Sequence, residues 1–365
     1  MRIHEIIDAL NFYANPFLQE DYDNAGLITG SNNWECKGAL VCLDATEDVI
    51  NEAINKKYNL VIAHHPIVFK GLKKINGNNY VERALILAIK HDIALFAIHT
   101  NLDNVIDGVN GKIAKLLGLQ NRKVLLPKKS VLQQLSVFVP TAHKETLLHA
   151  LFAAGAGNTG KYSECSFSVA GTGSFKAMEG SEPFVGKQGE RHLETEEKLD
   201  VIFPVWKQSD IVQAMKAAHP YEEVAYYLYN LDNIFMETGS GVIGDLPEKM
   251  EEGLFFEKIR QIFNIPVIKH SKWRKKSVKK VALCGGAGSF LTGAAITAGA
   301  DVYLTGDLKY HEFFDADNSL VLADIGHFES EQYTIDLLFD YLREKFPNFA
   351  VLKTGINTNP VCYFK

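Results

Sequence analysis

The sequence of 365 residues has few cysteines and no long apolar run. Its five cysteines include no C-x-x-C pair, which argues against a thiolate zinc site and is typical of a reduced protein. No apolar stretch is long enough to span a bilayer, and the first residues follow the pattern of an amphipathic helix rather than a signal peptide. We therefore expect a cytoplasmic protein that does not bind membranes.

The chain also lacks a large net charge of either sign. Its net charge is −6, with acids and bases interspersed, so nucleic acid is an unlikely partner and small molecules or other protein chains are expected. One basic stretch, residues 269–280, could contact nucleic acid or phosphate. Only Trp273 is interleaved with its charges, which favours a solvated loop.

The phosphate-binding motifs of nucleotide enzymes are absent as well. The glycine-rich turn Gly285–Ser289 matches neither the dinucleotide fingerprint nor the phosphate loop. Its backbone amides could hold an anion at the start of the following helix. Alternatively, its glycines simply allow a tight turn between a strand and a helix.

Alternating strand and helix patterns are present in residues 1–125 and return in residues 237–365. In the first segment, short β-branched runs alternate with amphipathic helical patterns, which predicts a mostly parallel sheet covered by helices. Each of these two segments is expected to form an α/β lobe. In the first lobe, strands are expected over 38–44, 59–65 and 93–98, and helices over 46–54 and 81–90.

An inserted domain is predicted between the two lobes, over residues 126–236. Residues 120–129 are polar and suit a linker. The insert then shows the order β-α-β-β-α-β, which is the ferredoxin-like arrangement. Its two central strands are separated by residues 171–198, interpreted as a long exposed loop. The sequence His219-Pro220-Tyr221 could be a small binding loop or an ordinary turn.

Two adjacent histidines, His64 and His65, end a short β-branched strand and precede Pro66. Proline favours an extended residue before it, and ligand pockets of α/β sheets lie at such strand ends. Because neighbouring residues of a strand point to opposite faces, the alternative is one histidine in the core and one in water.

Further candidate ligands follow other predicted strands. Nitrogen and carboxylate ligands without thiolates suit Zn, Mn, Fe or Co, and five of them can hold two ions. A pair of ions about 3.5 to 4 Å apart activates a water and clamps the substrate oxygens. His327 and Glu331 lie four residues apart and share a helix face, although an ordinary exposed ion pair has the same spacing. The candidate metal ligands are His64, His65, Asp103, His327 and Glu331.

Other polar residues at strand ends have alternative roles. His99 could bind a metal or only support Asp103, and His311 could bind an anionic substrate or be a solvated helix start. Either histidine could also move protons in catalysis. Three acids also end strands and are expected to be helix caps or turn residues: Asp44, Asp307 and Asp324.

Five motifs lie in the two outer lobes: Asp23–Leu27, His64–Ile67, Ile98–Asp103, Thr305–Asp307 with His311, and Gly326–Glu331. Taken together, they resemble the Nif-three-like family of dinuclear metal proteins, which includes GTP cyclohydrolase type-two homologues. They follow the order that the family shows, and the middle segment is similar to the CutA-like or PII-like insert of its long bacterial members. The family's tryptophan before the first motif is Tyr22 here.

The resemblance implies a two-metal site with all five candidate ligands, in which Asp103 and Glu331 bridge two divalent ions, with zinc expected and iron or manganese as alternatives. It also implies a toroidal homohexamer. Our first functional hypothesis is a metal-dependent hydrolase of a nucleotide or related heterocycle. The alternative is a non-enzymatic metal-binding hexamer whose insert senses a ligand or docks a partner.

Overall fold

The computed structural model describes residues 1–364, and the chain divides into two units. One unit joins Met1–Pro127 to Glu237–Lys365, and the other contains Lys128–Met236. The first unit holds two sheets, and the second unit holds one.

A five-stranded sheet is built around the strand that ends on the two histidines. This strand, β3 (Leu60–His65), lies between β2 (Ala39–Asp44) and β4 (Ala94–Ala97), and the three strands are parallel. β15 (Val351–Lys353) extends the sheet in parallel beside β2, and β1 (Gly26–Thr29) closes the other edge antiparallel to β4. Because β2, β3 and β4 are parallel, the polar residues that end them meet at one edge.

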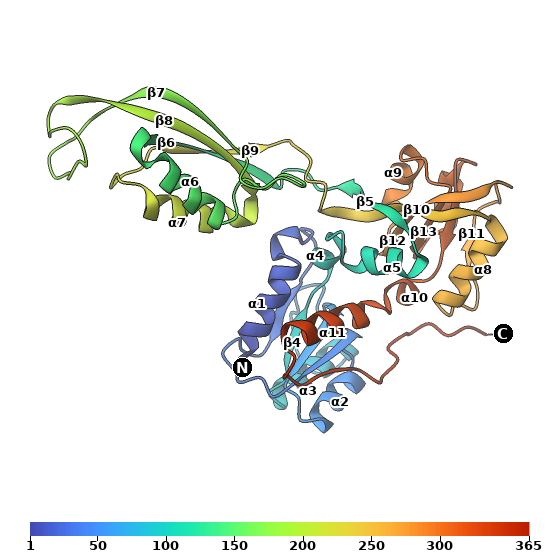
Figure 1. Ribbon diagram of the computed structural model, residues 1–365. Helices are drawn as coiled ribbons and strands as arrows, with labels where there is room; N and C mark the ends of the chain where they lie inside the picture. Colours follow the sequence, from blue (N-terminus) through green and yellow to red (C-terminus); the bar gives the residue numbers. More distant parts are fainter. Residues whose placement is uncertain (365) are drawn as a thin grey trace. The chain divides into compact units, whose positions relative to one another are not determined.

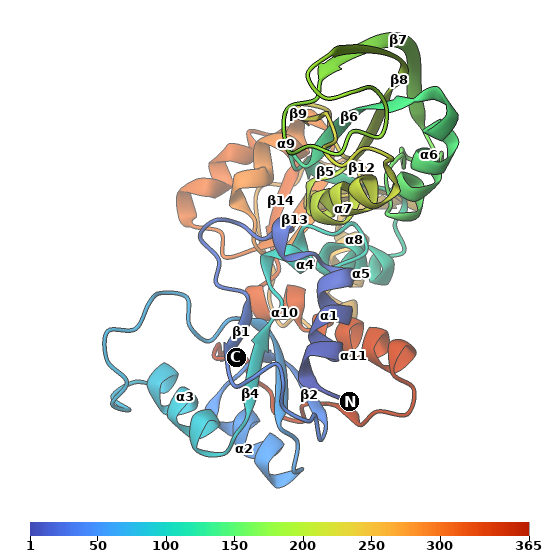
Figure 2. The same cartoon turned by 90° about the vertical axis from the view of Figure 1, so that its left-hand side faces the viewer.

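Helices cover both faces of this sheet (Figures 1 and 2). α2 (Glu47–Asn55) and α3 (Tyr80–Lys90) bury apolar side chains against one face. α1 (Ile3–Tyr13) and α11 (Thr334–Lys345) cover the other. The start of α2 is capped by Thr46, whose hydroxyl accepts a hydrogen bond from the amide of Val49.

The second sheet has six strands, and its central three are parallel: β12 (Ser277–Ala287), β13 (Val302–Gly306) and β14 (Val321–Asp324). Antiparallel strands flank this centre on both sides. On one side β10 (Gly239–Glu251) pairs with β12, and β5 (Gln120–Pro127) pairs with β10 at the edge; on the other side β11 (Lys269–His270) pairs with β14.

The two sheets of the first unit share one hydrophobic core. A single cluster of buried side chains includes Ile62 and Phe96 of the five-stranded sheet and Val281 and Leu304 of the six-stranded sheet. The carboxyl ends of strands in both sheets can therefore contribute to one site. Remaining elements of this unit are α4 (Thr100–Asp103), α5 (Val109–Leu117), α8 (Glu252–Ile262), α9 (Thr292–Thr297), α10 (His327–Glu331) and the 3-10 helices Pro16–Leu18, Ser289–Leu291 and Tyr310–Ala316.

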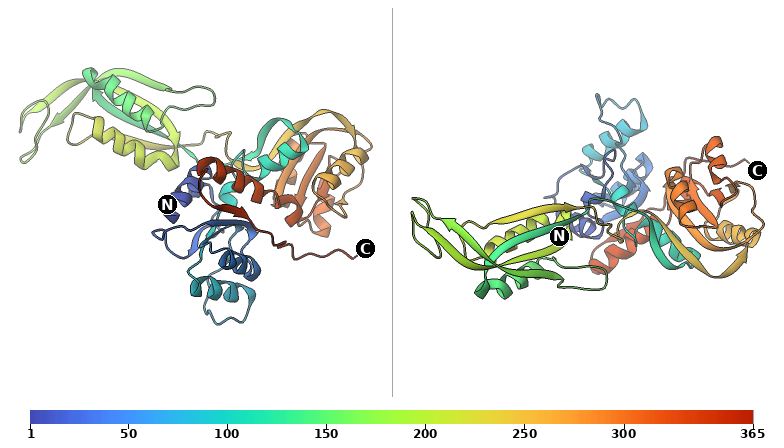
Figure 3. Two further views of the ribbon diagram at one scale, coloured as in Figure 1. Left: turned by 60° about the horizontal axis from the view of Figure 1, so that its bottom comes forward. Right: turned by 90° about the horizontal axis from the view of Figure 1, so that it is seen from above.

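The second unit is a four-stranded antiparallel sheet with two helices on one face (Figure 3). Along the chain its elements follow the order strand, helix, strand, strand, helix, strand, and across the sheet the strands follow the order β7-β8-β6-β9. Its core is separate and centres on Leu135, Leu151 and Met215. The elements are β6 (Leu132–Pro140), α6 (Lys144–Ala153), β7 (Ser166–Lys176), β8 (Arg191–Pro204), α7 (Gln208–Ala218) and β9 (Tyr226–Leu231).

Two loop predictions were wrong in part, because strands with exposed sides occupy much of both segments. Of residues 171–198, expected to be a loop, residues 177–190 do form a loop, but the two ends extend β7 and β8 as a hairpin whose pairs run from Gly171 opposite Glu196 to Lys176 opposite Arg191. Residues 120–129, expected to be a linker, form the edge strand β5 through Pro127. Neither segment has the apolar alternation of a half-buried strand, since little of it is covered.

The basic stretch 269–280 is ordered by acidic side chains. Glu252, which is buried, accepts hydrogen bonds from the backbone amides of Arg274 and Lys275. Asp301 accepts from the amides of Lys279 and Lys280. These contacts give the stretch a structural role at the start of β12.

Candidate metal centre

The end of β3 brings both adjacent histidines into one polar cluster. His64 is fully buried and His65 is partly buried, and their ring centroids lie 4.9 Å apart. Ring contacts link His65 to His99 from the end of β4 and to His327 from α10, at 5.4 and 5.2 Å between centroids. The alternative of one core histidine and one solvated histidine is therefore wrong.

Each of the two histidines is held by its Nδ1 atom. His64 Nδ1 lies 2.8 Å from the carbonyl oxygen of Ile98. A carbonyl only accepts, so Nδ1 carries the proton and Nε2 keeps its lone pair. His65 Nδ1 lies 2.8 Å from Asp44 Oδ1, which orients this ring in the same sense. Both rings therefore present Nε2 as the atom that can bind a metal.

The other two histidines of the cluster follow the same pattern. His327 Nδ1 lies 2.7 Å from Asp307 Oδ2, and His99 Nδ1 lies 2.8 Å from Asp23 Oδ1. Asp23 is held in turn by the amide and hydroxyl of Thr100, at 3.1 and 2.6 Å. Fixed acceptors on Nδ1 are the arrangement found around metal-binding histidines.

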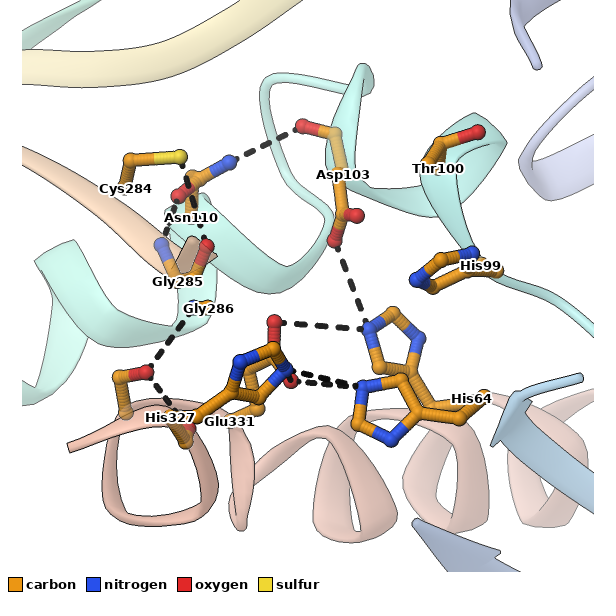
Figure 4. A network of polar contacts seen from close by, with 12 residues as sticks. His64, His99, Thr100, Asp103, Asn110, Cys284, Gly285, Gly286, His327 and Glu331 are labelled. Atoms are coloured by element: carbon orange, nitrogen blue, oxygen red, sulfur yellow. Dashed lines mark hydrogen bonds and ion pairs between the residues drawn. The ribbon is translucent and has the colours of Figure 1, made fainter. Parts of the chain in front are cut away.

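Two carboxylates face these imidazoles, as Figure 4 shows for the labelled side chains. Glu331 Oε2 lies 2.9 Å from His65 Nε2 and 3.1 Å from His327 Nε2. Its other oxygen, Oε1, lies 3.9 Å from His64 Nε2, and Asp103 Oδ1 lies 3.6 Å from the same nitrogen. Glu331 thus reaches both halves of the cluster with one oxygen each.

These side chains form three overlapping groups that could each hold a metal ion, because their ligand atoms lie within 4.8 Å of one another. Glu331 belongs to two of these groups. It joins His65 and His327 in one group, and His64 and Asp103 in the other. The groups are His64, Asp103 and Glu331; His65, His327 and Glu331; and His64, His65 and His99.

Two buried atoms of the cluster have no hydrogen-bond partner in the described part of the chain and are arranged as a cation would require. His64 Nε2 and Asp103 Oδ1 are both buried without a hydrogen-bond partner among residues 1–364. A lone pair on nitrogen and a carboxylate oxygen 3.6 Å apart are both electron donors, so neither can satisfy the other without a proton or a metal between them. The nitrogen and oxygen ligands present suit Zn, Mn or Fe.

The protonation of the cluster follows from its carboxylates. Burial lowers the pKa of His65, but Asp44 and Glu331 outweigh this effect and raise the pKa to about 10. For His327 burial again lowers the pKa, and Glu331 with Asp307 raises it to about 9. The carboxylates that stabilise these protonated rings would also stabilise a metal cation.

The carboxyl groups of Asp103 and Glu331 have pKa values shifted in opposite directions. Burial and the neighbouring charge of Glu331 raise the pKa of Asp103 to about 7. Burial also acts to raise the pKa of Glu331, yet its hydrogen bonds to His327 and His65 and the nearby His64 ring hold that pKa well below its usual range. Glu331 is therefore the ionised acid at the centre of the cluster.

The glycine-rich turn gives Glu331 its space. Gly286 has a φ of +62°, and a Cβ atom there would lie 2.3 Å from Glu331 Oε1. The amides of Gly285 and Gly286 donate to Asn110 Oδ1 at 2.9 Å and to Ser330 Oγ at 3.0 Å. These two amides are therefore engaged within the protein, and the turn serves close packing against the cluster.

Two residues that the sequence placed near the site lie outside these contacts. His311 is exposed on the 3-10 helix Tyr310–Ala316, where its ring contacts are with Tyr310 and Phe314. Among residues 1–364 no described contact joins His311 to the candidate ligands. Asp324 accepts hydrogen bonds from the amides of Leu308 and Gly326, as expected of a turn residue.

Sequence reasoning missed the residues that support the cluster. Asp44 and Asp307 were expected to be helix caps or turn residues, and Asp23 was recognised only as part of a motif. Each of the three carboxylates fixes one imidazole. Asn110 was not recognised at all. It bonds Gly285 and donates to the carbonyl oxygen of Asp103 at 3.0 Å, and no local sequence pattern marks such a bridge.

The fold and cluster together define a mixed α/β protein with a histidine and carboxylate site able to hold a metal. The sequence profile of Duf34/NIF3 (NGG1p interacting factor 3) matches residues 1–360, and the chain belongs to this family. Among residues 1–364, no helix has the length and apolar character needed to cross a membrane.

Known relatives are similar over nearly the whole chain. The "GTP cyclohydrolase 1 type 2 homolog" of Halalkalibacterium halodurans is 37% identical over 98% of each chain. The protein of the same name from Bacillus subtilis is 40% identical over 84% of this chain and 83% of its own. A crystal structure of a Bacillus cereus protein related to NIF3 has a TM-score of 0.87 and 37% identity, covering 100% of this chain and 99% of the other.

Proposed function

We propose that this protein is a metal-dependent hydrolase of a nucleotide or a related heterocycle. The observation that supports it most is the pair of buried electron donors, His64 Nε2 and Asp103 Oδ1, which have no hydrogen-bond partner. A buried set of donors arranged around Glu331 is what a hydrolytic metal site requires. The names of the relatives direct the choice of nucleotide substrates.

In this proposal, two divalent ions would be held by His64, His65, Asp103, His327 and Glu331, with the carboxylates of Asp103 and Glu331 available to both ions. Zinc is the expected metal, with iron or manganese as alternatives. When bound, such ions would lower the pKa of a water and draw negative charge from the substrate. The Nδ1 partners keep the Nε2 atoms aimed at the ions.

Proton transfer is assigned to His99, with His311 as a second candidate. The ring of His99 lies 5.3 Å from that of His64 between centroids, and Asp23 fixes its orientation through Nδ1. His311 is included on the motif resemblance alone. His311→Gln tests it: a lower kcat at unchanged metal content supports the role, and an unchanged kcat rejects it.

The test of the hydrolase is a substrate screen with metal-loaded protein. Purified protein loaded with Zn²⁺ or Mn²⁺ is incubated with GTP, other nucleotides, pterins and phosphoesters. Opening of the five-membered ring of guanine would be detected as released formate. We expect turnover by the wild type and by His91→Ala, an exposed histidine at the end of α3, and none by His327→Ala.

A negative screen would favour the other candidate function. If the wild type binds metal but hydrolyses none of these substrates, and His327→Ala behaves identically, the protein is better described as a metal-binding scaffold. The second unit supports this alternative, because it has its own core and could fold as a separate ligand-binding module.

We propose further that the chain has three domains, 1–125, 126–236 and 237–365, and that the middle one is an inserted ferredoxin-like domain. The order of its elements and the antiparallel order β7-β8-β6-β9 support this assignment. The homohexamer is proposed on the family resemblance alone, and light scattering on the purified protein would test it.

A further inference from the structure

The segment that follows β15, residues 354–364, is held mainly by polar side chains. Most of its residues are exposed, and only Thr354, Thr358 and Asn359 are partly buried. Each of these three donates a side-chain hydrogen bond to a carboxylate. Because β15 runs parallel to β2, the segment leaves the sheet at the edge where Asp44 ends β2.

The first contact of interest connects this segment to a candidate metal ligand. Thr358 Oγ1 donates to Asp44 Oδ2 at 2.6 Å. The other oxygen of the same carboxylate lies 2.8 Å from His65 Nδ1. Thr358 therefore fixes the rotation of the carboxylate that in turn fixes the imidazole.

The second contact connects the segment to α10. Asn359 Nδ2 and the Tyr363 hydroxyl both donate to Glu329 Oε1, each at 3.1 Å. Glu329 is buried and lies between His327 and Glu331 in the sequence of α10. Its other oxygen, Oε2, packs closely against Gly326, where an added Cβ atom would lie only 2.1 Å away.

We infer that residues 358–363 are a positioning clamp for the metal centre, with Thr358 acting through Asp44 on His65, and Asn359 and Tyr363 acting through Glu329 on α10. This inference rests on the metal site of the proposed function. The clamp residues bind no metal themselves; they set where the ligands from β3 and α10 lie.

The position of the clamp explains why it matters for metal binding. His65 comes from the five-stranded sheet, whereas His327 and Glu331 come from the helix that follows β14 of the six-stranded sheet. A metal bound by His65 and His327 needs these two elements at a fixed separation. The clamp contacts Asp44, which orients His65, and Glu329, which lies in α10. Losing these contacts would let the distance between β3 and α10 vary more widely and would weaken metal binding.

The chain offers a matched set of variants. Thr358→Val removes the hydroxyl and keeps the shape of the side chain, while Thr358→Ser keeps the hydroxyl. Thr354→Val is the control, because Thr354 makes the same kind of hydrogen bond to Glu52, which contacts none of the candidate ligands in the described structure. Asn359→Leu combined with Tyr363→Phe tests the second contact separately.

The experiment measures Co²⁺ binding to the full chain by titration calorimetry and follows the visible absorption of bound Co²⁺. Removing an outer partner of a metal ligand typically lowers metal affinity about 10- to 100-fold. We expect that loss for Thr358→Val, with an altered Co²⁺ spectrum, and affinity within about twofold of wild type for Thr358→Ser and Thr354→Val. The double variant should also change the spectrum. Circular dichroism of the metal-free proteins identifies any variant that fails to fold.

Equal Co²⁺ affinity and identical spectra for folded Thr358→Val and Thr354→Val, together with an unchanged double variant, would overturn the clamp while leaving the metal site in place. A wild-type protein that binds no Co²⁺ would overturn the metal site itself, and the clamp with it. The two failures are therefore distinguishable.

Discussion

At the scale of single residues, the imidazoles of the cluster owe their orientation to acceptors that bind no metal themselves. His64 uses a backbone carbonyl and His65 uses Asp44. A backbone carbonyl cannot rotate away, so His64 is held in one tautomer whether or not metal is present. The ligand atoms are thus prepared before a metal arrives, which reduces the cost of ordering them on binding.

We predict that His64→Ala and His65→Ala each deplete bound metal and leave the fold largely intact. Each change removes one nitrogen ligand: both histidines belong to the group with His99, and each also belongs to a second group that does not contain the other. Metal content per chain, measured by plasma mass spectrometry, should fall clearly below that of the wild type. His91→Ala serves as the control because it lies exposed at the end of α3. Full metal retention in either variant would contradict the assignment.

We predict that Gly286→Ala damages the cluster. Its φ of +62° is unfavourable for alanine, and its Cβ would press on Glu331 at 2.3 Å. A destabilisation of about 1 to 3 kcal/mol is expected, together with loss of metal. Urea unfolding and metal analysis measure the two effects.

Gly293→Ala is the matched control for this change. Gly293 lies in α9, and a Cβ there meets nothing within 4 Å. Alanine is favoured over glycine in a helix by up to about 1 kcal/mol, so this variant should be at least as stable as the wild type. Equal behaviour of the two variants would show that the turn tolerates a side chain.

The sequence was enough to select the candidate ligands because they follow strands, and parallel strands place their ends together. It could not assign the supporting residues. Asp44 looks like any acid before a helix, and its role depends on β2 lying beside β3 and on the distant Thr358. Such pairings are set by the order of strands in the sheet, which a local pattern does not encode.

At the scale of elements, strands with exposed sides were the ones that sequence patterns missed. The outer half of the β7–β8 hairpin pairs Gly173 with Glu194 and Thr172 with Thr195. Small and charged residues of this kind carry no alternation of apolar and polar positions. Gly173 also leaves room for Glu196, since a Cβ there would lie 2.0 Å from its Oε2 atom. Gly173 is therefore needed for close packing against Glu196, although glycine in a sequence usually indicates a loop.

The end of α7 contains a buried histidine whose neutral form is built into the second unit. His219 Nε2 lies 2.9 Å from the carbonyl oxygen of Phe138, and Nδ1 accepts from the amide of Tyr221 at 3.1 Å. Protonation of Nδ1 would break the second bond. Burial lowers the pKa of His219 below its ordinary value of 6.5, with nearby His143 acting in the same direction.

We predict that the second unit loses stability as the pH falls through about 6.5 and below. The unfolded chain binds a proton at His219 more readily than the folded chain, so acid favours unfolding. His219→Gln, which cannot titrate, should lose less stability between pH 7.5 and pH 5. Amide exchange of β6 and α7 at both pH values measures this. Equal losses in the two proteins would contradict it.

At the scale of the whole molecule, the candidate ligands come from β3, α4 and α10, which are far apart in the sequence but lie in one unit. Shared packing between two sheets makes this possible. The sequence predicted two α/β lobes but not that one core would join them, because which helix faces are covered depends on contacts between distant segments.

We predict that divalent metal stabilises the first unit and not the second. Metal that binds only the folded state adds about 2.7 kcal/mol at a concentration one hundred times Kd. Calorimetric scans with Zn²⁺ or with chelator should therefore move the transition of the first unit alone. His64→Ala should abolish the shift. A metal-dependent shift of both transitions would contradict this prediction.

The two strands that border the second unit have a consequence for how the chain tolerates change. β5 and β10 are antiparallel neighbours, and Pro127 lies opposite Gly239, so the residues between them occupy the place of a hairpin turn. Turns are among the sites of a fold that tolerate insertions and deletions. A change in the length of the segment between these two strands therefore leaves the order of the strands in the six-stranded sheet unchanged.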